Sequence, residues 1–179
     1  AGEDLVKRDA HRSARLGVAR TYQIPRPFPT LSIIENVALA ATFGAAALER
    51  KAAYREAGHW LEFVGLADRS AALPSALNLH QRKFLELARA LAGQPRLVLL
   101  DEVLSGLTPA EITSALALVR EIRRRGATIV FIEHNMRAVL ELVDRLIVLN
   151  YGEVIAQGLP REVVRQQDVV TAYLGAAHA

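Results

Sequence analysis

The chain has 179 residues, of which 51% are hydrophobic and 23% charged, and its formal net charge is +3. This length and composition suit one domain with a buried core, and they argue against disorder or low-complexity repeats. Because the chain has no cysteine, disulfide frameworks, cysteine metal sites and cysteine nucleophiles are excluded. The longest apolar runs are too short to cross a bilayer, which predicts a soluble protein.

The positive charge does not favour a nucleic-acid partner. The lysines are Lys7, Lys51 and Lys83, and the arginines are spread along the chain apart from the run at 123–125. That run ends a predicted helix, where cations suit the negative end of the helix dipole. We therefore expect no binding to nucleic acid.

The first half of the chain predicts a strand, a loop and a helical block. Residues 16–22 have the pattern of a short strand, and the loop after Gln23 contains three alternating prolines, which cannot continue a helix or a central strand. Ser32 and Glu35 then have the spacing of a capping box. Apolar residues at helical spacing predict further helices over 48–64 and 78–92.

From residue 96 onward strands and helices alternate, which predicts a three-layer α/β core with a parallel sheet. The apolar run at 96–100 is typical of a buried parallel strand. Thr108, Pro109 and Glu111 are suited to begin the next helix. A second buried strand is expected at 127–132, then a helix up to Val143, a strand–turn–strand over 145–156, and a short helix opened by Pro160.

The candidate chemistry lies where the predicted strands end. Gln23 follows the first strand, Asp101 and Glu102 follow the second, and His134 follows the third. Open α/β sheets bind ligands at this carboxyl edge, where Asp101 suits Mg²⁺ and Glu102 suits a base that polarises water. His134 could reach a terminal phosphate, and Gln23 could orient water or contact a metal-bound phosphate. An Asp-Glu pair that only caps its strand and a structural histidine remain the alternatives.

Taken in order, these motifs resemble the ATP-binding subunits of ABC transporters, from about Leu16 to Gly158. Gln23 stands at the Q-loop glutamine, residues 97–102 at the Walker B strand, Ser105 in the D-loop and His134 at the switch histidine. The resemblance implies a partial P-loop NTPase (RecA-like) three-layer core with a mainly parallel sheet and an α-helical subdomain. The segments implied are 1–28 (core with Q-loop), 29–93 (helical subdomain with signature helix) and 94–179 (core with Walker B, D-loop and switch histidine).

The resemblance also implies the roles of these residues. ATP would be the nucleotide, Asp101 and Gln23 would hold Mg²⁺, and Glu102 would be the catalytic base. His134 would sense the γ-phosphate. The family signature Leu-Ser-Gly-Gly-Gln appears here as Leu77-Asn78-Leu79-His80-Gln81. Asn78 still offers a polar side chain at a helix N-terminus that favours anions, whereas Leu79 and His80 are bulkier than glycine. We expect this variant signature to work, and the nucleotide to be contacted by Asn78, Leu79, His80, Gln81 and Ser105.

Residues 19–26, 32–37 and 158–163 are most similar to importers of branched-chain amino acids. The partners implied are a second ATP-binding subunit, identical or different, and transmembrane permease subunits that would contact the loop at 24–30. The implied location is the cytoplasm, peripheral on the cytoplasmic face of the inner (plasma) membrane. Transport-unrelated ABC ATPases, such as those of DNA repair, are not supported, because no long coiled-coil insertion precedes the signature.

The P-loop motif G-x-x-x-x-G-K-[ST] does not occur, because no lysine here follows a glycine. With 22 residues before Gln23, we expect a fragment of a cassette that binds ATP weakly and is inactive alone, although the parent protein is an ATPase. The strands ending before His134 and starting at Arg145 would then be unpaired, paired with each other or completed by another chain. A non-catalytic interaction module that docks on a permease or a full-length ATPase is the alternative.

Overall fold

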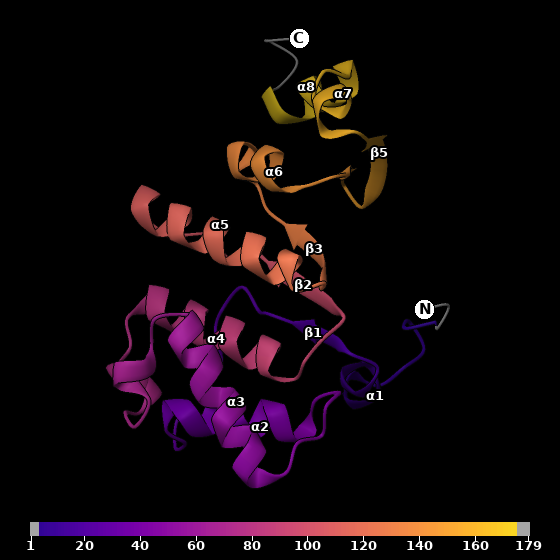
Figure 1. Ribbon diagram of the computed structural model, residues 1–179. Helices are drawn as coiled ribbons and strands as arrows, with labels where there is room; N and C mark the ends of the chain where they lie inside the picture. Colours follow the sequence, from indigo (N-terminus) through magenta and orange to yellow (C-terminus); the bar gives the residue numbers. More distant parts are fainter. Residues whose placement is uncertain (1–3, 175–179) are drawn as a thin grey trace. The chain divides into compact units, whose positions relative to one another are not determined.

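The computed structural model of the chain describes residues 4–174. Its contacts divide into two compact units, Ala1–Glu133 and His134–Ala179 (elements labelled in Figure 1). The division expected at residues 28 and 93 stays a prediction. Within the described residues, no helix combines the length and the apolar character needed to span a bilayer.

The first unit contains a three-stranded parallel sheet in the order β1-β2-β3. β1 (Val18–Arg20) pairs with the first residues of β2 (Leu97–Asp101), and β2 pairs along its whole length with β3 (Thr128–Ile132). Val98 and Leu100 of the central strand are fully buried, as its apolar run predicts. The parallel sheet is confirmed, and the carboxyl ends of its three strands lie at one edge.

Three helices pack against one another in the first unit (Figure 1). They are α2 (Ile33–Phe43), α3 (Arg50–Phe63) and α4 (Leu79–Ala92), with 3-10 turns at Ala67–Arg69 and Pro74–Ala76 between α3 and α4. The predicted capping box of α2 is present, because Ser32 and Glu35 each accept the backbone amide hydrogen of the other through their side chains. The helical block is therefore confirmed.

The C-terminal ends of α2 and α4 cross at two glycines. Gly44 follows α2 and Gly93 follows α4, and the amide of Ala45 donates to the Gly93 carbonyl at 3.0 Å. A Cβ built on Gly44 would lie 2.4 Å from the Cα of Gly93. The backbones can approach this closely because position 44 has no side chain.

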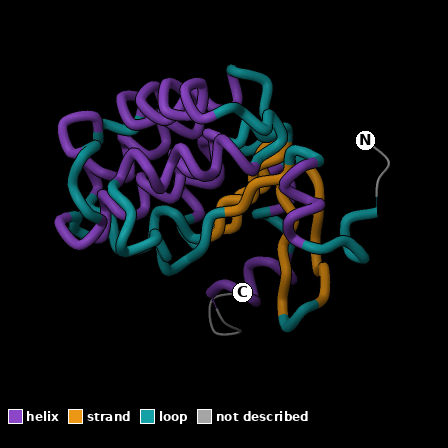
Figure 2. The backbone as a smooth tube through the Cα atoms, turned by 90° about the horizontal axis from the view of Figure 1, so that it is seen from below, coloured by secondary structure: helices purple, strands orange, loops and turns teal. Residues whose placement is uncertain are grey.

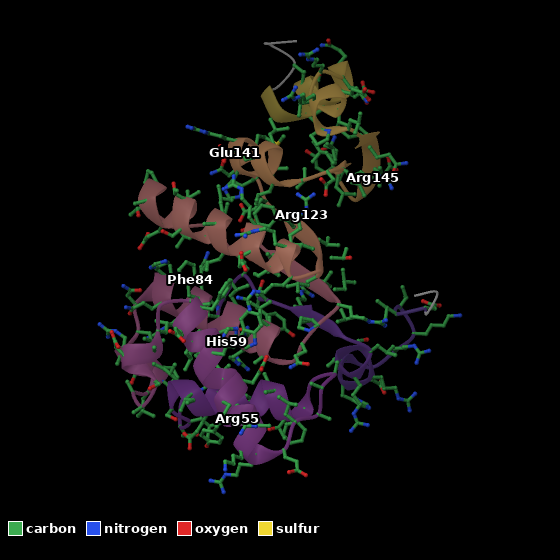
Figure 3. All side chains as sticks on the ribbon, viewed as in Figure 1. Arg55, His59, Phe84, Arg123, Glu141 and Arg145 are labelled. Atoms are coloured by element: carbon green, nitrogen blue, oxygen red, sulfur yellow. The ribbon has the colours of Figure 1, made fainter. Side chains whose placement is uncertain are left out.

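α5 (Pro109–Arg124) begins as the sequence predicts. Thr108 accepts the amide hydrogen of Glu111 through its hydroxyl, and the Glu111 carboxylate accepts the amide hydrogen of Thr108. Past its C-terminal end, Nη1 of Arg125 lies 3.0 Å from Nε2 of His59 on α3 (His59 is labelled in Figure 3). One member of the arginine run at 123–125 therefore packs on α3.

The second unit is built on an antiparallel hairpin (strands drawn in orange in Figure 2). β4 (Leu146–Asn150) and β5 (Glu153–Gly158) are joined by Tyr151 and Gly152, whose φ angles are 46° and 85°. Two positive φ values are typical of the type I′ turn that joins hairpin strands. The predicted strand–turn–strand is confirmed. The other elements are α6 (Met136–Leu142), α7 (Pro160–Val163) and α8 (Gln167–Leu174), and the core consists of Val148, Ala156, Val163 and Val169.

Among residues 4–174, β3 pairs only with β2 and β4 pairs only with β5. Because the two strands belong to different units, which of the three expected outcomes holds for them stays a prediction. On β3, Val130 and Ile132 are 46% and 55% exposed.

α1 (Ala10–Arg15) precedes β1, and β1 is shorter than the strand predicted at 16–22.

Candidate functional site

Thr21 joins the ends of β1 and β2. It is 1% exposed, and its amide donates to the Leu99 carbonyl at 2.9 Å. Its hydroxyl accepts the amide hydrogen of Asp101 at 3.2 Å, so the last residue of β2 has a partner in the residue that follows β1. These bonds fix where the chain leaves each strand, and they set the positions of Gln23 and Glu102.

Gln23 and Glu102 form the centre of the candidate site. Nε2 of Gln23 donates a hydrogen bond of 2.5 Å to Oε2 of Glu102. Glu102 has a φ of 47°, in the left-handed region that residues other than glycine rarely adopt, and its amide donates to the Ile132 carbonyl of β3 at 2.9 Å. A backbone of this kind persists where neighbouring contacts hold it. The structure thus brings together two predicted residues that are 79 positions apart in the chain.

Asp101 lies beside this pair, and its carboxylate is engaged by Arg20. Nη2 of Arg20 is 2.9 Å from Oδ2 of Asp101, and the Arg20 guanidinium lies 5.4 Å from the centre of the Tyr22 ring. The carboxylate of Asp101 and the amide oxygen of Gln23 are donors of the kind that Mg²⁺ prefers, so the chemistry of the donor set fits. A cation at Oδ2 would compete with Arg20. Within residues 4–174, no group of three or more His, Cys, Asp or Glu side chains could hold a metal ion.

The variant signature forms the first turn of α4. The Gln81 amide donates to Oδ1 of Asn78 at 2.9 Å, and the Asn78 amide donates to Oε1 of Gln81 at 3.1 Å. The Asn78 side chain therefore lies at the helix N-terminus, as expected, where its oxygen caps the helix. Leu79 follows it and is 54% exposed.

His80 links α4 to the start of α5. Its Nδ1 lies 3.2 Å from Oε1 of Glu111, and its ring packs edge-on against Phe84, with 4.2 Å between the centroids (Phe84 is labelled in Figure 3). Its Nε2 is buried without a hydrogen-bond partner. Leu79 reaches Gly106, because a Cβ on that glycine would lie 3.7 Å from Cδ2 of Leu79. The two bulky signature residues therefore contact the segment that follows β2.

Ser105 belongs to the turn after β2. Its amide donates to the Glu102 carbonyl at 3.2 Å, and its own carbonyl accepts a hydrogen bond from Nζ of Lys83. The structure therefore places the backbone of Ser105 next to Glu102.

The proline-rich loop after Gln23 is pinned at two places. Asn36, which is fully buried, accepts the amide hydrogen of Phe28 at 2.8 Å and donates to the Phe28 carbonyl at 3.1 Å. On α4, the carboxylate of Glu86 accepts the amide hydrogen of Arg26 at 2.9 Å. The loop is thus fastened to the helical block, while Ile24 and Phe28 remain 68% and 45% exposed.

His134 begins the second unit. It is exposed and lies in the bend between β3 and α6, next to Asn135, whose side chain caps α6 by accepting the amide hydrogen of Ala138 at 3.2 Å. Because His134 belongs to the other unit, the structure does not relate it to Gln23 and Glu102. Its role stays a prediction.

Sequence reasoning missed four side chains around the site: Arg20, Thr21, Lys83 and Glu133. Oε1 of Glu133 accepts the amide hydrogen of Leu104 at 2.7 Å, and Lys83 binds carbonyls of the same turn. One signal was available, because Lys83 stands within the apolar stripe of α4 and lysines are buried only with partners.

Comparison with known proteins identifies the family. The ABC transporter family model matches residues 1–105, and the model of the branched-chain amino acid ATP-binding cassette transporter matches residues 153–179. The chain is 34% identical to the high-affinity branched-chain amino acid transport ATP-binding protein BraF of Pseudomonas aeruginosa, over 98% of this chain and 74% of BraF. It is 36% identical to LivG of Salmonella typhimurium, a protein of the same description, over 92% of this chain and 70% of LivG.

Solved structures agree in fold. An ATP-binding cassette of an ABC transporter in its ADP conformation matches with a TM-score of 0.80 and 25% identity, over 97% of this chain and 74% of that one. A nucleotide-free cassette matches with a TM-score of 0.79 and 24% identity, over 96% and 74% of the two chains. The chain therefore belongs to the ABC transporter family, as an ATP-binding subunit of the branched-chain amino acid importer type.

Proposed function

We propose that this chain carries the water-activating half of an ATPase site that energises an importer of branched-chain amino acids. The observation that carries the proposal is the hydrogen bond between Gln23 and Glu102, beside Asp101, at the carboxyl edge of the parallel sheet. Open α/β sheets bind their ligands at this edge. The names of the relatives support the substrate class.

Glu102 acts as the general base that polarises the attacking water. Gln23 orients its carboxylate through Nε2, which leaves the amide oxygen of Gln23 as a donor for a cation. Asp101 and Gln23 hold Mg²⁺, which when bound neutralises charge on the phosphates. Because Arg20 contacts the same carboxylate oxygen of Asp101, binding of the metal must weaken this salt bridge. The affinity for the metal therefore depends on the strength of the contact between Arg20 and Asp101.

The first turn of α4 faces a nucleotide held by a second ATP-binding subunit, identical or different. Its backbone amides and the positive end of the helix dipole suit a terminal phosphate. Asn78 and Gln81 stabilise this turn, and Ser105 lies in the turn beside Glu102. Leu79 and His80 replace glycines of the family signature, and His134 senses the γ-phosphate.

The proline-rich loop receives the permease. Ile24 and Phe28 offer exposed apolar surface on a loop that Asn36 and Glu86 fasten to the helical block. A movement of the permease would thus reach Gln23 through a short, anchored connection. This partner places the chain on the cytoplasmic face of the membrane.

The 179 residues bind MgATP weakly by themselves, because phosphate affinity in this family depends on a P-loop that the sequence does not contain. The second candidate is a non-catalytic module that docks on a permease or on a full-length ATPase. Its support is that Arg20 engages Asp101 and that Asn78 is used as a helix cap.

A graft separates the two candidates. A P-loop-bearing segment from a family member is joined in front of Ala1, and ATP hydrolysis is measured for this graft and for its Glu102→Gln variant. We expect the graft to hydrolyse ATP, and the variant to keep nucleotide binding but hydrolyse about 10²–10⁴-fold more slowly, the usual contribution of a general base.

Glu49→Gln in the same graft is the matched control, because Glu49 is exposed and its side chain makes no cap hydrogen bond. A Glu102→Gln graft that hydrolyses ATP at the rate of the control would refute the catalytic proposal. A graft that binds ATP but never hydrolyses it would favour the docking module.

A further inference from the structure

Lys83 is the buried cation of α4. The residue is 7% exposed and stands beside Phe84 on the apolar side of the helix. Its ammonium donates to the carbonyls of Glu102, Val103 and Ser105, at 3.1, 3.5 and 2.5 Å. An ammonium has three N–H donors, and here three backbone carbonyls accept from it.

The charges around Lys83 offset part of the cost of burying it. Burial lowers the pKa of Lys83 from its usual range, and the carboxylates of Glu133 and Glu102 oppose that effect. Glu133 also accepts the amide hydrogen of Leu104, so the turn after β2 is held by an anion and a cation together. A buried charge with this many partners is bound to one geometry.

The turn that Lys83 holds contains the strained residue of the site. Glu102 has its φ at 47°, and its carbonyl accepts both from Lys83 and from the amide of Ser105. A left-handed backbone at glutamate is unfavourable without external support. The Lys83 ammonium provides that support from outside the turn, because three carbonyls of the turn accept hydrogen bonds from it.

We propose that Lys83 is a positioning residue for Glu102: its ammonium holds the backbone of residues 102–105 so that the Glu102 carboxylate stays on Gln23. The same lysine lies in α4, five residues after the Asn78 cap, so the turn that carries the base is tied to the signature helix. This inference rests on the proposed function, because it assigns a role in setting the geometry of its base.

The first test measures by NMR how fast the ammonium protons of Lys83 exchange with water. The chain has three lysines, and Lys7 and Lys51 are exposed, so ¹⁵N-lysine labelling gives a small set of Nζ signals. We expect the Lys83 ammonium protons to exchange with water at least about tenfold more slowly than those of the other two lysines. Exchange as fast as that of Lys51 would overturn the inference.

The second test reads the contact between Gln23 and Glu102. The side-chain NH₂ signal of Gln23 is identified as the one missing from the NMR spectrum of Gln23→Ala. Its chemical shift without the carboxylate partner is taken from the spectrum of Glu102→Gln. We expect Lys83→Met to move the chemical shift of the Gln23 NH₂ group toward the value seen in Glu102→Gln. Lys83→Arg should move it less, because arginine keeps a charged donor. Lys51→Met is the control and should leave it unchanged.

A folded Lys83→Met chain with an unmoved Gln23 signal would show that Lys83 only stabilises the fold. If this variant does not fold, the Lys83→Arg comparison replaces it, and fast exchange of the Lys83 ammonium in the unmodified chain would still overturn the inference. None of these signals requires nucleotide, so they stay readable if the Glu102→Gln graft hydrolyses ATP normally and the proposed function fails.

Discussion

Glu35 and Glu111 close the capping boxes of α2 and α5. The Glu35 carboxylate accepts from the hydroxyl and the amide of Ser32, at 2.6 and 2.7 Å, and these bonds lower the pKa of Glu35 in that order of importance. The Glu111 carboxylate accepts from the amide and the hydroxyl of Thr108, at 2.7 and 2.9 Å, and the amide is the larger cause of its lowered pKa. Both carboxylates are thus favoured in their charged form.

A pKa that is lower in the folded than in the unfolded state stabilises the fold above the unfolded pKa. That stabilisation is lost as the pH falls through the lowered folded pKa. We therefore expect the free energy of unfolding to fall on the acid side of the ordinary glutamate range. Urea unfolding at a series of pH values measures this. In the double variant Glu35→Gln, Glu111→Gln, the free energy of unfolding should decrease less as the pH falls, whereas in Glu49→Gln it should decrease as much as in the unmodified chain. Parallel curves for all three proteins would contradict this account.

At the scale of elements, the crossing of α2 and α4 depends on Gly44. A methyl group there would meet the backbone of Gly93 at 2.4 Å, and backbone cannot move aside as a side chain can. We expect Gly44→Ala to destabilise the chain by about 1–3 kcal/mol, the usual cost of overpacking. Thermal or urea unfolding measures this.

Gly58 supplies the matched control for that prediction. It lies inside α3, and a Cβ there would have no atom within 4 Å. Gly58→Ala should therefore stabilise the chain by up to about 1 kcal/mol, because alanine loses less entropy in a helix. Changes of the same sign at both glycines would contradict the proposed close approach.

The elements that the sequence predicts well are those with local signals. Capping residues and apolar periodicity locate α2 and α5, and a continuous apolar run locates β2. α1 was missed because it buries no side chain and has no side-chain cap, so neither pattern marks it. β1 proved shorter than predicted, because it pairs with the first three residues of β2 only.

At the scale of the whole molecule, the edge that gathers Gln23 and Glu102 was predictable from strand order, because parallel strands end at one edge. The contacts of Arg20, Thr21 and Lys83 were not. Arg20 and Thr21 meet β2 from about 80 positions away, and Lys83 binds backbone carbonyls that have no side-chain signature. Such contacts depend on three-dimensional packing rather than on local sequence patterns.

The chain spans 74% of BraF and 70% of LivG of Salmonella typhimurium, and its sequence contains no P-loop motif. We infer that the chain supplies the residues that activate water at an ATP site, at the sheet edge of Gln23 and Glu102, and that the phosphates of the nucleotide are bound by a P-loop. If so, nucleotide affinity should appear when a P-loop is supplied, without any change to the residues described above.

Equilibrium titration with a fluorescent ATP analogue and Mg²⁺ tests this claim directly, on the 179-residue chain and on the P-loop graft side by side. We expect saturable binding by the graft at concentrations of about 1–100 μM, and no saturation of the chain alone below about 1 mM. Tight binding of the nucleotide by the 179-residue chain alone would contradict this claim, because the phosphates would then be bound by residues other than a P-loop. A graft that folds and binds no nucleotide would contradict it equally, because the edge would not belong to an ATP site.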